Sequence, residues 1–133
     1  MPKFSNASLN LLSQCHPDLQ AVMKEAIKTI DFSILSSTIR TVAEQEQFVA
    51  DGKSKTMNSK HLKRPDGYSY AVDIWKYPIN WNDEKGQTEL ARYILGIADA
   101  FFTAGKIKNK IGWGGDWKTF LDMPHFEILQ NKV

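Results

Sequence analysis

The sequence predicts an α+β fold, and two observations support this prediction. Apolar residues at helical spacing dominate the early part of the chain, while most strand-like segments come later. The length of 133 residues suits one domain with one buried core, and no repeat or linker divides it. We therefore expect a single domain over residues 1–133, with helices packed on one side of a small antiparallel sheet.

The first predicted helix covers residues 17–30. Pro17 is tolerated at a first helical position, and the carboxylate of Asp18 suits the positive end of the helix dipole. His16 precedes both, and we expect it to cap the helix rather than to bind a metal. The apolar residues at helical spacing are Leu19, Val22, Met23, Ala26, Ile27 and Ile30.

A strand and a second helix are predicted next. Residues 32–39 are rich in apolar residues, Ser and Thr, which favours a strand. Thr41 and Glu44 fit a capping box, in which each side chain bonds a backbone N–H at the start of a helix. That helix should stop at Gly52, and a basic loop rich in breakers should follow over 53–67.

The second half of the chain predicts three strands and one long helix. Residues 68–74 alternate between large and small side chains, as a half-buried strand does, and Asp73 lies on the small-residue face. Apolar residues on one stripe predict a helix over 88–104. Two further strands are expected at 111–113 and 125–129, on either side of a Gly-Gly turn.

Composition excludes several classes of function. A formal net charge of +2 is too small to indicate nucleic-acid binding. The single cysteine, Cys15, excludes an intrachain disulfide and a Cys-rich zinc site, and we expect it to be a small buried apolar side chain. The N-terminus lacks the pattern of a secretory signal, and no apolar stretch approaches the ~20 residues that span a bilayer. We therefore expect no membrane insertion and a cytoplasmic origin.

Two of the three histidines have neighbours that suit metal chemistry. His61 lies in the basic loop before the strand that carries Asp73, and His125 follows Asp122 by three residues. A catalytic zinc ion needs three protein ligands, an open position for water and a base for the proton of that water. Spacing alone also allows a solvated loop histidine, a strand-end aspartate and a hydrogen-bonded strand histidine.

Arg40 is the candidate for contacting a substrate. It precedes the capped helix, where its planar guanidinium could bind a substrate carboxylate or a developing oxyanion. The alternative is a surface ion pair with Glu44. The basic run 53–63 is more typical of a solvated loop than of a binding patch.

Several separated motifs resemble a known family of zinc peptidases. In chain order they are His16-Pro17-Asp18-Leu19-Gln20, Ile39-Arg40-Thr41 with Gln45, Ser59-x-His61, Gly67, Ala71-x-Asp73, Trp113-Gly-Gly-Asp-Trp117 and Asp122-x-x-His125. Together they resemble the VanY-like D-alanyl-D-alanine carboxypeptidase family, and within it the L-alanyl-D-glutamate endopeptidase branch of phage endolysins. An apparent insertion at 63–68 departs from the shorter form of the pattern.

The resemblance implies a site and an activity. His61, Asp73 and His125 would hold a zinc ion, Asp122 would be the general base, and Arg40 would anchor or polarise the substrate. The substrate would be the stem peptide of bacterial peptidoglycan, cut at its L-alanyl-D-glutamate bond. We expect a monomer that stays in the cytoplasm of an infected host until a membrane-permeabilising protein lets it reach the wall.

Three other functions are considered. A D-alanyl-D-alanine carboxypeptidase would use the same metal site on a different bond. A non-catalytic wall-binding module would have no use for the proton acceptor Asp122. A nucleic-acid-binding domain is supported only by the basic loop.

Overall fold

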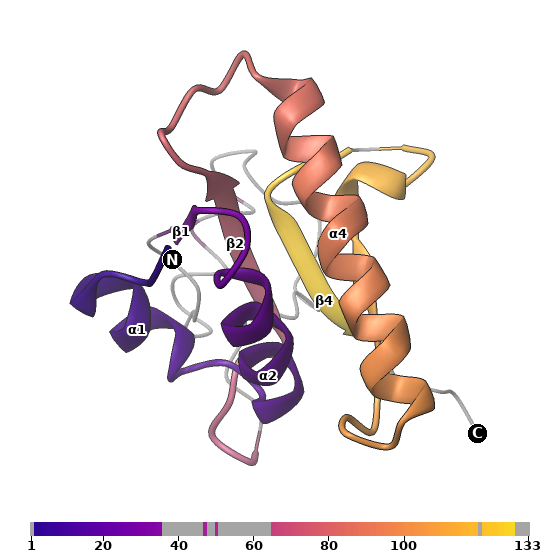
Figure 1. Ribbon diagram of the computed structural model, residues 1–133. Helices are drawn as coiled ribbons and strands as arrows, with labels where there is room; N and C mark the ends of the chain where they lie inside the picture. Colours follow the sequence, from indigo (N-terminus) through magenta and orange to yellow (C-terminus); the bar gives the residue numbers. More distant parts are fainter. Residues whose placement is uncertain (1, 36–46, 48–49, 51–64, 120, 130–133) are drawn as a thin grey trace.

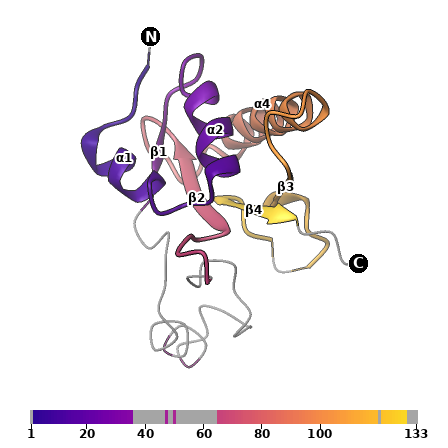
Figure 2. The same ribbon diagram turned by 90° about the horizontal axis from the view of Figure 1, so that it is seen from below.

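A four-stranded antiparallel sheet forms the centre of the protein. The computed structural model describes residues 2–35, 47, 50, 65–119 and 121–129. The sheet has the strand order β1-β2-β4-β3, and α2 and α4 cover one of its faces (Figures 1 and 2). The strands are β1 (Phe32–Ile34), β2 (Ala71–Lys76), β3 (Lys110–Trp113) and β4 (His125–Leu129). The helices in the described part are α1 (Asn6–Leu12), α2 (Pro17–Ala26) and α4 (Glu84–Thr103). The predicted α+β class and antiparallel sheet are confirmed.

Of the first two helices, the sequence predicted α2 but not α1. We did not predict α1, which begins where the Ser5 side chain accepts a hydrogen bond from the Ser8 backbone N–H at 3.1 Å. The predicted cap of α2 is confirmed, because His16 Nδ1 accepts from the Asp18 N–H at 3.0 Å. This helix ends at Ala26 rather than at residue 30, since the chain continues in tight turns there.

The other boundaries differ from prediction by a few residues. Helix α4 begins four residues before the predicted 88, because Asp83 caps it by accepting from the Gly86 N–H at 3.0 Å. The predicted strand 68–74 is observed as β2. It begins three residues later than predicted, because Ser69 pairs instead with the backbone around Cys15, and it ends two residues later. Most of the helix predicted at 41–52, the residues 36–39 and most of the loop 53–67 lie outside the described residues. Within 41–52 only Gln47 and Ala50 are described, and both are helical.

The core lies between the helices and one face of the sheet. Several strand residues that point toward α2 and α4 are completely buried, among them Val72, Ile74, Phe126 and Ile128. Cys15 is also buried, as predicted, and burial followed by the charge of Asp73 raises the pKa of its thiol to about 12. The thiol is therefore neutral and belongs to the core.

The opposite face of the sheet carries polar and aromatic side chains. Residues directly opposite in an antiparallel pair point to the same face, and residues two apart on a strand do so as well. Asp73 pairs with His125, so these two side chains share the face that α2 and α4 do not cover. The same alternation places Trp75 and Glu127 on this face, which we call the polar face.

The predicted lack of a membrane-spanning segment can be checked in the helices. Within the described parts of the chain, none of them combines the length and the apolar character that crossing a bilayer requires.

Candidate metal-binding site

Asp73 and His125 form the centre of the candidate site. They lie opposite each other on β2 and β4, and His125 Nδ1 is 3.5 Å from Asp73 Oδ1. The His125 side chain is 7% exposed and the Asp73 side chain 18%, so both are largely shielded from solvent. Two ligands at about 2.1 Å from a tetrahedral ion are separated by about 3.4 Å, which is close to this spacing. The pair is therefore placed as two ligands of one ion would be.

Asp122 reaches the same place from the turn before β4. Its Oδ2 atom lies 4.0 Å from His125 Nδ1, and its side chain is 42% exposed. The turn is held by two backbone bonds, from the His125 N–H to the Asp122 carbonyl and from the Asp122 N–H to the Gly114 carbonyl, both 3.1 Å. A Cβ at residue 114 would collide with the Asp122 carbonyl oxygen, so this approach requires glycine.

Together the three side chains could hold a metal ion. One carboxylate oxygen from Asp73, one from Asp122 and the Nδ1 atom of His125 all lie within 4.8 Å of one another. Imidazole nitrogen and carboxylate oxygen are suitable donors for zinc and for several other divalent metals. The donor chemistry and the spacing therefore fit a metal centre.

Glu127 fixes the orientation of the histidine ring. It lies two residues after His125 on the same face, is 15% exposed, and places Oε1 at 2.8 Å from His125 Nε2. When Nε2–H donates to this carboxylate, the lone pair of Nδ1 points toward Asp73 and Asp122. A carboxylate behind a histidine is a common support for a metal ligand. We did not single out Glu127 in the sequence, although strand alternation places it beside His125.

Two tryptophans support the site from opposite sides. Trp117 packs its ring 5.1 Å from the His125 ring on the polar face. Trp113 lies on the helix side, where it stacks against Phe126 and donates from Nε1 to the Met123 carbonyl at 2.6 Å. Trp113 therefore holds the segment that leads into β4 from the helix side of the sheet.

Arg92 connects α4 to the short 3-10 helix Gly114–Asp116. Its guanidinium makes two hydrogen bonds to Asp116, at 2.7 and 2.9 Å, and lies 5.3 Å from the centre of the Trp113 ring. This contact fixes the turn that carries the Gly-Gly pair next to Asp122.

The charges around His125 favour its protonated form. Burial lowers the pKa of His125, but hydrogen bonds and charges from Asp73 and Glu127 raise it by more, to about 9. A metal ion must therefore displace a proton from Nδ1 at neutral pH. This cost makes metal binding at the site dependent on pH.

Comparison with known proteins assigns the chain to a family. The sequence model of the family described as phage L-alanyl-D-glutamate peptidase matches residues 1–129. The chain belongs to this peptidase family. The resemblance seen in the motifs is thereby confirmed.

Two relatives have names that agree with the family. The chain is 28% identical over 120 residues to the peptidoglycan L-alanyl-D-glutamate endopeptidase CwlK of Bacillus subtilis, covering 80% of this chain and 65% of the length of CwlK. The crystal structure of the L-Ala D-Glu endopeptidase ChiX of Serratia marcescens superposes with a TM-score of 0.76 at 28% identity, covering 96% of this chain and 91% of ChiX.

The structure brings together part of the site predicted for this peptidase family. Asp73, Asp122 and His125 converge, as the motifs imply. The motif glycine Gly67 has a φ of 87°, a conformation that other residues rarely adopt. His61 and Arg40 lie outside the described residues, so their roles as a metal ligand and as a substrate contact stay predictions.

Proposed function

We propose that the chain is a zinc-dependent endopeptidase that hydrolyses the L-alanyl-D-glutamate bond in the stem peptide of peptidoglycan. The observation that carries this proposal is the convergence of Asp73, Asp122 and His125 on the polar face of a chain that belongs to the phage L-alanyl-D-glutamate peptidase family. The names of CwlK and ChiX support the same bond.

Asp73 and His125 are proposed as zinc ligands, with His61 as the third. Asp73 is the better ligand of the two aspartates, because it lies on a strand, is less exposed and is closer to Nδ1 than Asp122 is, at 3.5 against 4.0 Å. When bound, zinc supplies an acidified water molecule and a positive charge beside the scissile carbonyl.

Asp122 is proposed as the general base. Its side chain is 42% exposed, so it can reach a water molecule and a peptide that approach the polar face from solvent. It would accept the proton of the attacking water and return it to the departing amine of D-glutamate. Arg40 would bind the substrate or stabilise the oxyanion. Glu127 would keep the ring of His125 in the tautomer that ligation requires.

The test is digestion of purified Gram-negative peptidoglycan with and without a chelator, followed by mass spectrometry of the fragments. We expect chelator-sensitive release of peptides that newly begin with D-glutamate, and loss of this activity in Asp122→Asn. Removal of only a terminal D-alanine would mean a carboxypeptidase. Absence of any cleavage by folded, zinc-loaded protein would favour a wall-binding module and overturn the proposal.

The proposed setting is lysis of an infected bacterium, which the phage origin of the family supports. The enzyme would act as a monomer, and it would reach the wall after a separate membrane-permeabilising protein opens the inner membrane. Expression in a bacterium should therefore cause lysis only when such a protein is also produced. Lysis by this chain alone would contradict that requirement.

A further inference from the structure

Two tryptophans form an aromatic surface beside the candidate metal site. Trp75 is 4% exposed and is covered by Trp81, whose ring centre lies 5.0 Å away and whose side chain is 57% exposed. Trp75 Nε1 donates to the Asn80 carbonyl at 2.9 Å, and the Asp83 N–H donates to the same oxygen at 3.0 Å. These bonds hold the loop that carries Trp81, so a large aromatic face is presented to solvent in a fixed position.

This surface lies a short distance from the proposed ligand Asp73. Trp75 is two residues from Asp73 on β2, so both side chains are on the polar face and about 6.6 Å apart along the strand. Tyr77, two residues further along, is 54% exposed. We call Trp75, Tyr77 and Trp81 the aromatic platform.

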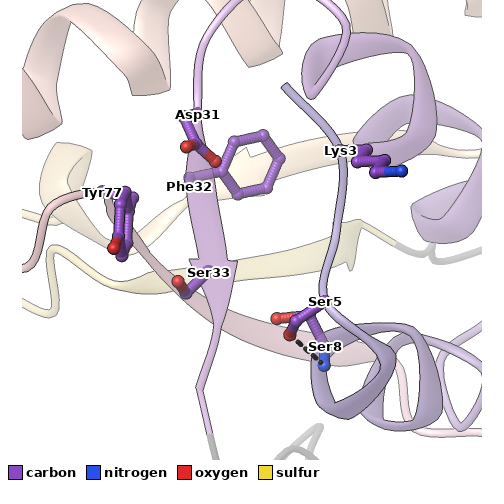
Figure 3. A pocket seen from close by; sticks show the side chains of 7 residues that line it. All are labelled: Lys3, Ser5, Ser8, Asp31, Phe32, Ser33 and Tyr77. Atoms are coloured by element: carbon purple, nitrogen blue, oxygen red, sulfur yellow. Dashed lines mark hydrogen bonds between the residues drawn. The ribbon is translucent and has the colours of Figure 1, made fainter. Parts of the chain in front are cut away.

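A polar pocket continues from the end of the platform. Its volume is about 230 Å³, and Tyr77 forms part of its wall (Figure 3). Ser33 of this pocket pairs with Trp75 across the β1–β2 ladder, which places the pocket and the platform on adjoining parts of one surface. The other lining residues are Lys3, Ser5, Ser8, Asp31 and Phe32. Hydroxyl, carboxylate and ammonium groups therefore line the pocket together with the Tyr77 ring.

We propose that the platform and this pocket bind the glycan strand of peptidoglycan, next to the bond that is cut. This inference rests on the proposed function. The scissile carbonyl belongs to L-alanine, which a lactyl group links to the sugar. An extended alanine and lactyl group span about 7 Å, which matches the separation of Asp73 from Trp75.

The chemistry of the surface suits a neutral sugar. The C–H groups on one face of a pyranose ring carry partial positive charge and stack on the electron-rich face of an aromatic ring. The hydroxyl and amide groups at the sugar's edge need donors and acceptors, which the pocket provides.

The charges around the surface balance, which disfavours the acidic half of the stem peptide as its occupant. Lys76 lies 3.7 Å from Asp83 in an ion pair beside the platform. The pocket itself contains one cation, Lys3, and one carboxylate, Asp31. A peptide that carries the carboxylates of D-glutamate and the residues after it would instead require a net positive surface.

The test compares two substrates that differ only in the sugar. One is the disaccharide tetrapeptide, and the other is the same tetrapeptide with an acetyl group in place of the muramyl group. We expect the intact protein to prefer the first in kcat/KM. Trp81→Ala should reduce that preference by about tenfold, the effect of losing one stacked ring. Tyr77→Ala should reduce it less, and Trp81→Phe should restore part of it.

Leu9→Ala is the matched control. Leu9 is 42% exposed on α1 and does not line the pocket, so the preference should not change. Equal losses on both substrates in Trp81→Ala would mean that the platform binds the peptide, and would overturn the inference. Equal cleavage of both substrates by the intact protein would overturn it as well.

A binding measurement separates this inference from the proposed activity. Peptide-free glycan strands are titrated into the full chain, and the indole N–H signal of Trp81 is followed by NMR. We expect a saturable shift of this signal, and no shift would contradict glycan binding. If neither substrate is cleaved, the proposed function fails, but the NMR result still decides whether the platform binds glycan.

Discussion

The two faces of the sheet are built from the same strands, yet they carry different chemistry. On β4, Phe126 and Ile128 are completely buried against the helices, while His125 and Glu127 point to the polar face. On β2, Ile74 faces the core and Asp73 faces the candidate metal site. The helix-covered face therefore fixes the strand register, and that register places the ligands. Substitutions on the two faces should have separable effects.

The largest effect is expected on the polar face, at Asp122. Asp122→Asn should lower the rate of peptidoglycan hydrolysis by about a thousandfold, because the proton acceptor is lost. The melting temperature and the bound zinc should change little, since the side chain is half exposed and outside the core. Hydrolysis rates, metal content and thermal melting check this. A rate near that of the parent would exclude Asp122 as the base.

On the helix-covered face the effect should be on stability instead. Ile128→Ala should lower the free energy of unfolding by about 2–5 kcal/mol, because a fully buried side chain leaves a cavity. Denaturant unfolding of the metal-free protein measures it. At temperatures where the variant is folded, its zinc affinity should remain within a few-fold of the parent value. A large loss of zinc affinity would show that the two faces are not separable.

Substitution of Glu127 tests how far zinc affinity depends on the orientation of the His125 ring. Glu127→Ala should weaken zinc binding by about 10–100-fold, since the bond that orients the His125 ring is lost. Glu127→Gln keeps an acceptor oxygen at this position and should restore part of the affinity. Competition with a coloured chelator gives the dissociation constants. Unchanged affinity in Glu127→Ala would mean that the ring is positioned by Asp73 and Trp117 alone.

The effects of pH are the smallest only when they are counted per pH unit. Because the pKa of His125 is about 9 in the metal-free protein, each pH unit below that value should weaken zinc binding by about tenfold. Chelator competition between pH 6 and 9 measures this slope. A flat profile would show that Nδ1 carries no proton there.

The stability of the metal-free protein should depend on pH in the opposite sense to zinc affinity, and should decrease as pH rises. The pKa of His125 is raised on folding from its ordinary value of 6.5 to about 9. Between these values the folded state binds more protons than the unfolded state, so stability should decrease as pH rises from 6.5 through 9. Thermal melting without zinc checks the direction. His125→Gln should remove most of the slope.

Much of this fold could be predicted because its patterns are local. The bounds of β4 and the cap of α2 follow from alternation and from the pair His16–Pro17, each within a few residues of sequence. Helix α1 was missed because it is short and buries only Ser8 and Leu12, which is too few residues to show a period. Its start depends on the single cap at Ser5.

The site was harder to predict, because it depends on contacts distant in sequence. Asp73 pairs with His125, and the sequence around either residue does not indicate this pairing. From spacing alone, the metal site was only one of several interpretations. The resemblance of the ordered motifs to a known family was what favoured the metal site over the alternatives. No sequence pattern indicates which nitrogen of His125 faces the aspartates, and so the role of Glu127 emerged only from the geometry.

The most direct test of the account is a crystal structure of the zinc-loaded protein, with the ion located by its anomalous scattering. We expect the zinc peak on the polar face, about 2.0–2.2 Å from Asp73 Oδ1 and His125 Nδ1, with Nε2 still bonded to Glu127. Zinc bound elsewhere, or bound through Nε2 of His125, would contradict the proposed site and the orientation on which it depends.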